Sequence, residues 1–151
     1  MSDKELLNKL SKYCAYQERS VHDVMNRLNK YQVDPVLRSV IIEKLKLEGF
    51  LNEERFARLY TLGKLKNNHW GKIKIIRGLK NKRIENQIID KVIKAIDETE
   101  YVAIIDNLIK KKENHLRREE LFIRKHKIAR FMIYKGFESD IVWDRINKKL
   151  E

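Results

Sequence analysis

The chain has 151 residues, enough for one domain or a short array of small domains with a modest hydrophobic core. Its formal net charge of +12 favours a polyanionic partner such as nucleic acid. It contains no apolar stretch long enough to span a membrane and no apolar signal core in MSDKELLNKL, and Cys14 is its one cysteine. We therefore expect a cytoplasmic protein without a membrane segment or an internal disulfide.

One proline and few period-two alternations predict helices nearly throughout the chain. Ser20, Asp34 and Asn52 are expected as N-caps, and Gly49 and Gly136 as helix stops. In chain order the nine expected helices cover about 4–16, 21–31, 35–49, a segment opening after Asn52, 68–80, 85–96, a segment after an acidic break at 97–100, 119–135 and 138–150.

These helices repeat three times along the sequence. Aligning the chain on Val33, Ile84 and Phe137 places residues of the same type in seven columns, with intervals of 51 and 53 residues. Two of the columns hold Val24, Ile75 and Ile128, and Leu28, Leu79 and Met132. The sequence therefore predicts an all-α fold of three tandem three-helix repeats, 1–50, 51–97 and 98–151, in an elongated, curved right-handed helical array.

The positive charge is concentrated in two blocks. Residues 57–84 carry nine Lys and Arg and no Asp or Glu, and residues 110–135 carry ten basic and three acidic residues. On the expected helix 68–80, helical spacing turns Lys74 and Arg77 outward.

The repeat alignment places Lys127 and Arg130 at the positions of Lys74 and Arg77, whereas the first repeat has Asp23 and Asn26 there. We therefore predict a basic binding face in the second and third repeats. The alternative interpretation is an ordinary solvated helix surface.

No pattern in the chain indicates an enzyme. A Gly-rich phosphate loop, a nucleophile elbow and an HExxH motif are absent, and the four histidines lack metal-ligand spacing. The acidic pairs Glu53-Glu54 and Glu119-Glu120 begin expected helices, where the helix dipole explains them. Cys14 lies on an apolar helix face, which indicates a buried structural residue. We expect no catalytic residue, metal or cofactor.

Three stretches resemble one known family. GFLNEERFA at 49–57, followed by WGKIKIIRGLK at 70–80, is similar to the central signature of the RecX regulators of the RecA recombinase. Residues 13–15 and 17–20 with Leu28 resemble the first repeat of that family, and residues 130–131 with 135–137 resemble its last. The resemblance implies a crescent of three three-helix repeats that lodges in the groove of the RecA filament on DNA and restrains its activities.

The residues that match the family's central motif are Arg55, Phe56, Trp70, Gly71, Lys74 and Leu79. Phe56 and Leu79 are expected to be structural. Trp70, in the first turn of the expected helix, is expected to be a packing residue, and the alternative is a platform on which a nucleic-acid base stacks. The predicted partner-binding or DNA-binding residues are Arg55, Lys64, Lys66, Trp70, Lys72, Lys74, Arg77, Lys127, Arg130 and Tyr134.

Two functions remain open at this point. The first is a non-enzymatic, monomeric regulator that binds the RecA–DNA filament and inhibits RecA recombinase, ATPase and coprotease activity in DNA repair and the SOS response. Such a protein is expected to bind DNA weakly and with little sequence preference, and not to bind membranes. The alternative is a stand-alone basic helical nucleic-acid-binding protein or transcription factor.

Overall fold

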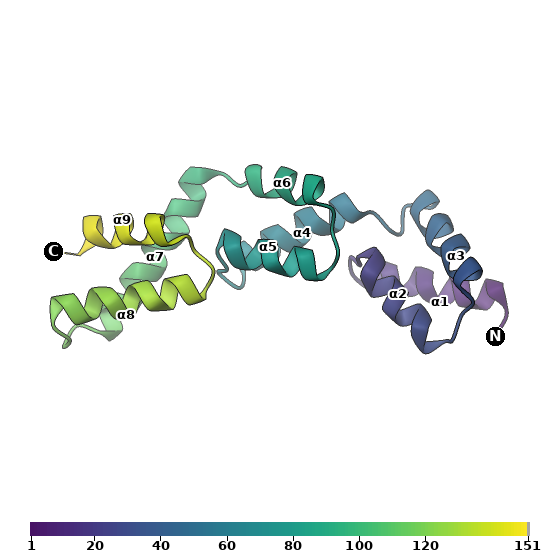
Figure 1. Ribbon diagram of the computed structural model, residues 1–151, viewed down its shortest axis with the longest axis horizontal. Coiled ribbons are helices and arrows are strands. Elements are labelled where there is room, and N and C mark those ends of the chain that lie inside the picture. The colour runs from purple at the N-terminus through teal and green to yellow at the C-terminus, as the bar shows by residue number, and fades with distance from the viewer. Residues whose placement is uncertain (151) are drawn as a thin grey trace. The chain divides into compact units, whose positions relative to one another are not determined.

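The computed structural model describes residues 1–150, and within that range it consists of nine α-helices without a β-strand (Figure 1). The all-α prediction is confirmed. None of the described helices combines the length and the apolar character needed to cross a bilayer. The helices are α1 (Asp3–Tyr16), α2 (Val21–Lys30), α3 (Pro35–Leu47), α4 (Glu53–Lys66), α5 (Lys72–Asn81), α6 (Asn86–Lys94), α7 (Glu98–His115), α8 (Leu121–Tyr134) and α9 (Ser139–Lys149).

The three predicted N-caps all form the expected hydrogen bonds. The Ser20 hydroxyl accepts a hydrogen bond from the Asp23 amide, and the Asp23 carboxylate accepts one from the Ser20 amide, which completes a capping box. The Asp34 carboxylate accepts from the Val36 amide at 2.7 Å, and Asn52 Oδ1 accepts from the Arg55 amide at 2.8 Å. The starts of α2, α3 and α4 are therefore set by residues local in sequence.

The predicted start of the fifth helix at Asn68 is wrong. The helix begins at Lys72, because backbone groups before it are bonded elsewhere: the Trp70 amide donates to the Lys64 carbonyl, and the Gly71 amide to the Lys135 carbonyl. His69 has a φ of 54°, in the left-handed region. Trp70 therefore precedes α5 instead of lying in its first turn.

The acidic segment 97–100, expected as a break, is the beginning of α7. Asp97 is the N-cap, and its carboxylate accepts a hydrogen bond from the Glu100 amide at 3.1 Å. Glu98 and Glu100 lie in the first helical turn, where the positive end of the helix dipole stabilises carboxylates.

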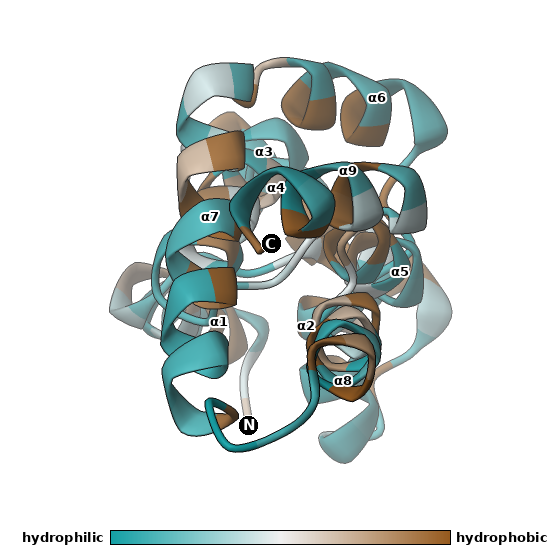
Figure 2. Ribbon diagram, turned by 90° about the vertical axis from the view of Figure 1, so that its left-hand side faces the viewer, coloured by the Kyte–Doolittle hydropathy of each residue, from teal (hydrophilic) through white to brown (hydrophobic). Residues whose placement is uncertain are grey.

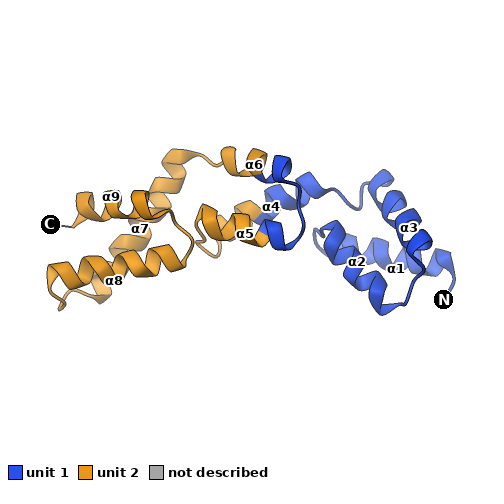
Figure 3. Cartoon of the chain, viewed as in Figure 1, with its two compact units in different colours: residues 1–60, 79–89 blue, residues 61–78, 90–151 orange. Residues whose placement is uncertain are grey.

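The chain forms two compact units (Figure 3). The first comprises residues 1–60 and 79–89, and the second comprises residues 61–78 and the chain from Asp90 onward. The boundaries fall inside α4, α5 and α6.

Apolar side chains from α1, α2 and α3 form the core of the first unit. Each helix contributes one stripe, and Figure 2 shows hydrophobic and hydrophilic residues on opposite sides of single helices such as α6. The buried residues of this core are Leu6, Leu10, Cys14, Val24, Leu28, Ile41, Ile42, Leu45 and Leu51.

The core of the second unit is formed mainly by α7, α8 and α9, which pack against one another. An ion pair on its edge joins α9 to α7, since the Arg145 guanidinium donates to both carboxylate oxygens of Asp106, at 2.8 and 2.7 Å. The buried residues of these helices and of the turn between α8 and α9 are Tyr101, Ile105, Ile109, Ile128, Ala129, Met132, Phe137, Val142 and Ile146.

Two columns of the repeat alignment are fully buried in all three copies. Their six residues each have 0% relative exposure: Val24, Ile75, Ile128, Leu28, Leu79 and Met132. Helices α2, α5 and α8 thus use the same two positions to contact a core. The curvature and handedness of the array stay predictions.

Candidate functional site

The N-terminus of α5 is hydrogen-bonded to the turn between α8 and α9. The Gly71 amide donates to the Lys135 carbonyl at 2.9 Å, and the Ile73 amide donates to the Gly136 carbonyl at 3.0 Å. A Cβ on Gly71 would lie 2.3 Å from the backbone of Gly136, and a Cβ on Gly136, where φ is +98°, would lie 2.4 Å from the Lys74 Cβ. Both positions need glycine, because a side chain would separate the two backbones.

Tyr101, on α7, also makes a hydrogen bond to the N-terminus of α5. Its hydroxyl accepts a hydrogen bond from the Lys72 amide at 3.0 Å and donates one to the Glu138 carboxylate. Burial, together with the hydrogen bond to Glu138, raises the pKa of the Tyr101 hydroxyl. The Lys72 ammonium lies 4.5 Å from the centre of the Tyr101 ring and pairs with Glu98. Lys72, a predicted partner residue, is thus largely enclosed, with 15% of its side chain exposed.

The contact between the N-terminus of α5 and the α8–α9 turn places two aromatic rings beside Lys74. The Lys74 ammonium lies 4.6 Å from the centre of the Trp70 ring and 5.2 Å from that of Tyr134. The Lys64 ammonium lies 4.7 Å from the Trp70 ring, and the Lys135 ammonium donates to the Asn68 carbonyl at 2.7 Å. We call Lys64, Trp70, Lys74, Tyr134 and Lys135 the aromatic–basic cluster.

The cluster concentrates positive charge beside an accessible aromatic face. Tyr134 is 78% exposed. Partial burial lowers the pKa of Lys135, and the nearby Lys74 ammonium lowers it further. Ammonium groups of this kind bind phosphate or carboxylate oxygens, and an exposed tyrosine ring offers a flat surface for stacking or apolar contact.

Four of the ten predicted site residues therefore meet at one place: Lys64, Trp70, Lys74 and Tyr134. Lys74 was expected to point outward, but it is half-buried, because the two rings flank its side chain. Lys135 was missed. Its position beside Tyr134 and before the helix stop at Gly136 is the only signal in the sequence that could have indicated it.

The other predicted residues on α5 and α8 lie outside the cluster. Arg77 and Arg130 are exposed on their helices. Lys127 and Arg130 share a helix face with Tyr134, because they precede it by seven and four residues. The Lys127 ammonium pairs with Glu119 at 2.6 Å.

Lys66 and Arg55 make ion pairs within their own units. The Lys66 ammonium lies 3.3 Å from the Glu100 carboxylate in the second unit. In the first unit, the Arg55 guanidinium donates to the Glu18 carboxylate at 2.8 Å and to the Gly49 carbonyl at 2.9 Å. Both residues thus have acidic partners nearby, and a role for either in binding a partner stays a prediction.

The surroundings of Cys14 and Glu53, two potentially reactive groups noted in the sequence, indicate structural roles. Cys14 is 5% exposed, and burial raises the pKa of its thiol to about 11, so the thiol is protonated at neutral pH. Glu53 accepts a hydrogen bond from the Val21 amide at 2.6 Å, and burial raises the pKa of this carboxyl. Across residues 1–150, no three His, Cys, Asp or Glu side chains converge in a way that could hold a metal ion.

Comparison with known protein families places most of the chain in one family. Residues 52–93 match the domain family described as "RecX, second three-helix domain", and residues 98–145 match "RecX, third three-helix domain". The cluster residues Lys64, Trp70 and Lys74 lie within the first of these matches, and Tyr134 and Lys135 lie within the second.

Curated relatives carry the same family name. "Regulatory protein RecX" of Bacillus thuringiensis (strain Al Hakam) is 25% identical over 130 residues, which cover 86% of this chain and 48% of the relative. The protein of that name from Lactobacillus johnsonii (strain CNCM I-12250 / La1 / NCC 533) is 32% identical over 101 residues, which cover 67% of this chain and 37% of the relative. The chain therefore spans about half the length of the first relative and less than half the length of the second.

Two crystal structures share the fold. One is RecX from Lactobacillus salivarius, with a TM-score of 0.88 and 23% identity over 97% of this chain and 95% of that chain. The other is described as regulatory protein RecX, with a TM-score of 0.86 and 19% identity over 97% of this chain and 72% of that chain.

Proposed function

The chain belongs to the RecX family of regulatory proteins, and from that premise we propose that it binds the RecA–DNA filament and inhibits RecA. The affected activities are the recombinase, ATPase and coprotease functions of RecA, in DNA repair and the SOS response. The protein acts in the cytoplasm without catalysing a reaction itself, and its own contact with DNA is weak and sequence-tolerant.

The aromatic–basic cluster is the observation that supports this proposal best. It gathers the ammonium groups of Lys64, Lys74 and Lys135 around Trp70 and the exposed ring of Tyr134. A filament on DNA offers phosphate oxygens and carboxylates, which ammonium groups bind, next to protein surface on which an exposed ring can pack. Aromatic residues at the centre of an interface often dominate its binding free energy.

Three tandem three-helix repeats, 1–50, 51–97 and 98–151, are part of the proposal. A repeated module can place equivalent surfaces at regular intervals, and a filament presents its own subunits at regular intervals. The exposed Arg77 and Arg130, at equivalent positions of the second and third repeats, extend the positive surface beyond the cluster.

An ATPase assay tests the proposal. RecA hydrolyses ATP on single-stranded DNA, and we expect this protein to slow hydrolysis in a concentration-dependent way. The double variant Lys74→Gln/Tyr134→Ala should need roughly tenfold more protein for the same inhibition, because it removes one cation and one aromatic ring from the contact. A matched control, Lys111→Gln/Phe122→Ala, removes an exposed lysine and an aromatic residue with 66% exposure from the same unit, and it should inhibit like the wild type.

Equal inhibition by the cluster variant and the control would show that the cluster is not the contact. A protein that leaves RecA hydrolysis unchanged but binds one duplex sequence in preference to others would instead be a stand-alone DNA reader.

A further inference from the structure

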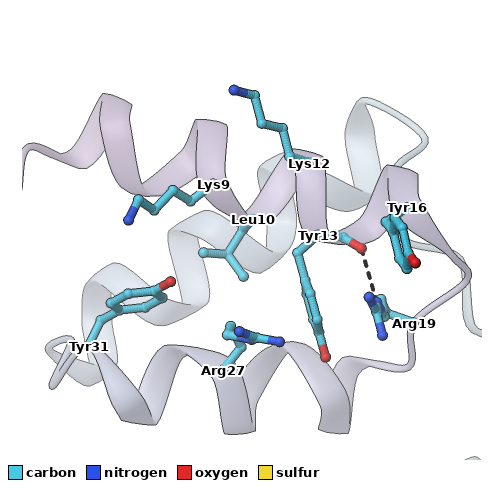
Figure 4. Close-up of a pocket in the computed structure, with 8 residues that line it drawn as sticks. All are labelled: Lys9, Leu10, Lys12, Tyr13, Tyr16, Arg19, Arg27 and Tyr31. Atoms are coloured by element: carbon cyan, nitrogen blue, oxygen red, sulfur yellow. Dashed lines mark hydrogen bonds between the residues drawn. The ribbon is translucent and has the colours of Figure 1, made fainter.

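A second cationic and aromatic site lies in the first unit, between α1 and α2 (Figure 4). It is a cavity of about 420 Å³, within the range of small-ligand pockets. Two arginines, two lysines, three tyrosines and Leu10 line it, and none of these eight residues is acidic. We call the part formed by Tyr13, Tyr16, Arg19, Arg27 and Tyr31 the arginine–tyrosine pocket.

The two arginines are held by one tyrosine. The Arg19 guanidinium lies 3.7 Å and the Arg27 guanidinium 4.3 Å from the centre of the Tyr13 ring, and Figure 4 shows the ring between them. Arg19 Nε also donates to the Tyr13 carbonyl at 3.0 Å. This leaves the terminal N–H groups of Arg19 for a ligand. Guanidinium groups fixed in this way lose little conformational freedom when they make bidentate hydrogen bonds to a phosphate.

The pocket is built on the core and opens at an exposed ring. Leu10, at its base, has 1% exposure, and Tyr13 and Tyr31 are half-buried against the core of the first unit. Tyr16, by contrast, is 84% exposed. The pocket therefore combines walls packed against the core with one aromatic face that a ligand can reach.

The carboxylates nearest in sequence do not neutralise these arginines, because they are paired with other cations. The Glu18 carboxylate lies 2.8 Å from the Arg55 guanidinium, and the Asp23 carboxylate lies 2.6 Å from the Lys82 ammonium. Burial alone would raise the pKa of Asp23, but its hydrogen bonds from Lys82 and Ser20 lower that pKa, as expected for a carboxylate already satisfied.

We propose that the arginine–tyrosine pocket binds a nucleotide of single-stranded nucleic acid, with a phosphate on Arg19 and Arg27 and a base against the Tyr16 ring. Fixed guanidinium groups recognise the phosphate, and tyrosine rings stack with any base, so the site tolerates sequence. A single strand fits better than a duplex, because the base must be unstacked to expose its face. This site is separate from the aromatic–basic cluster. The proposal rests on the proposed function in one respect, since it takes nucleic acid to be the polyanion that the protein meets.

Fluorescence anisotropy of a labelled oligothymidylate of about 12 nucleotides, titrated with the full chain and without RecA, tests the proposal. Arg19→Gln/Arg27→Gln should weaken binding at least roughly tenfold, because two charge-assisted contacts are lost. The slope of log K against log salt should become shallower by about 0.7, since both arginines hold the same phosphate and each neutralised phosphate contributes about 0.7 on a single strand. Lys4→Gln/Lys44→Gln, at exposed positions outside the pocket, is the charge-matched control and should stay within roughly threefold of the wild type.

Tyr16→Ala keeps the test decisive if the arginine variant loses its fold, because this side chain is exposed and its removal leaves the core intact. It should weaken binding of the single strand by roughly five-fold to a hundred-fold and affect the same strand much less after it is annealed to its complement. Unchanged binding by Tyr16→Ala, or an equal loss for single strand and duplex, would overturn the proposal.

Two further arms separate this proposal from its alternatives. If the arginine variant reduces sedimentation with phosphatidylserine vesicles while oligonucleotide binding stays unchanged, the pocket binds lipid and the proposal is wrong. The same titrations in the Lys74→Gln/Tyr134→Ala background separate it from the proposed function: the pocket variants should still weaken binding there, whether or not the cluster variant changes RecA inhibition.

Discussion

At the scale of single residues, two glycines determine where α5 can begin. The backbones at Gly71 and Gly136 approach so closely that a methyl group on the first would lie 2.3 Å from atoms of the second. This contact carries Trp70, the residue before Gly71, toward Tyr134 near the end of α8. The geometry of the aromatic–basic cluster therefore depends on two residues that bind nothing themselves.

Gly71→Ala should destabilise the protein by about 1–3 kcal/mol, because the added methyl group overlaps backbone that can move only with the whole turn. Thermal unfolding followed by circular dichroism measures the effect. Gly63→Ala is the matched control: Gly63 lies inside α4 with nothing within 4 Å of an added Cβ. That substitution should stabilise the protein by up to about 1 kcal/mol through helix propensity. Similar melting of the two variants would show that the close contact is absent in solution.

At the scale of elements, the helix starts divide into those that the sequence predicts and one that it does not. Ser20, Asp34 and Asn52 cap α2, α3 and α4 with side chains adjacent to the helix, so a local pattern is enough to find them. The first amides of α5 bond instead to groups more than 25 residues away in the chain: the carbonyls of the α8–α9 turn and the Tyr101 hydroxyl. No local pattern could predict that, and the expected start was four residues too early.

Tyr101→Phe tests this remote capping. The variant removes the acceptor of the Lys72 amide and the donor to Glu138, so the free energy of unfolding should fall by about 1–3 kcal/mol at pH 7. Tyr134→Phe, at a ring that is 78% exposed, should change it by less than about 0.5 kcal/mol. Chemical unfolding in urea measures both.

The Tyr101→Phe substitution should also change how the free energy of unfolding depends on pH in alkaline solution. The pKa of Tyr101 is raised in the folded protein, so the protonated hydroxyl stabilises the fold below the unfolded-state pKa of about 10. That stabilisation is lost as pH rises above about 10, because the unfolded chain then releases the proton more readily. The difference between wild type and Tyr101→Phe should therefore shrink above pH 10, and a constant difference would contradict the buried hydrogen bond.

At the scale of the whole molecule, the charge distribution predicted one cationic surface and concealed another. Residues 57–84 have nine basic and no acidic residues, which indicated the region of the aromatic–basic cluster. Residues 1–56 have ten basic and nine acidic residues and therefore looked neutral. In the fold, Glu18 and Asp23 pair with Arg55 and Lys82, which leaves Arg19 and Arg27 without acidic neighbours in their pocket. Net charge along a sequence cannot show which charges are paired in space.

The net charge of +12 also sets how the protein binds duplex DNA on its own. With on the order of four to six phosphate contacts and no array of side chains for reading bases, log K should fall against log salt with a slope of about −3 to −5. Titrations of two unrelated duplex sequences at several salt concentrations measure this slope. A flat salt response, or strong preference for one sequence, would contradict the prediction.

The buried Cys14 has a practical consequence for following this protein at work. It is the one cysteine of the chain, and its thiol, at 5% exposure and with a pKa of about 11, is a poor target for maleimide dyes at neutral pH. A new cysteine at an exposed position such as Glu48 can therefore take a fluorophore selectively, with no need to mutate the native core. Single-molecule imaging of labelled protein on stretched DNA then becomes possible with an intact hydrophobic interior.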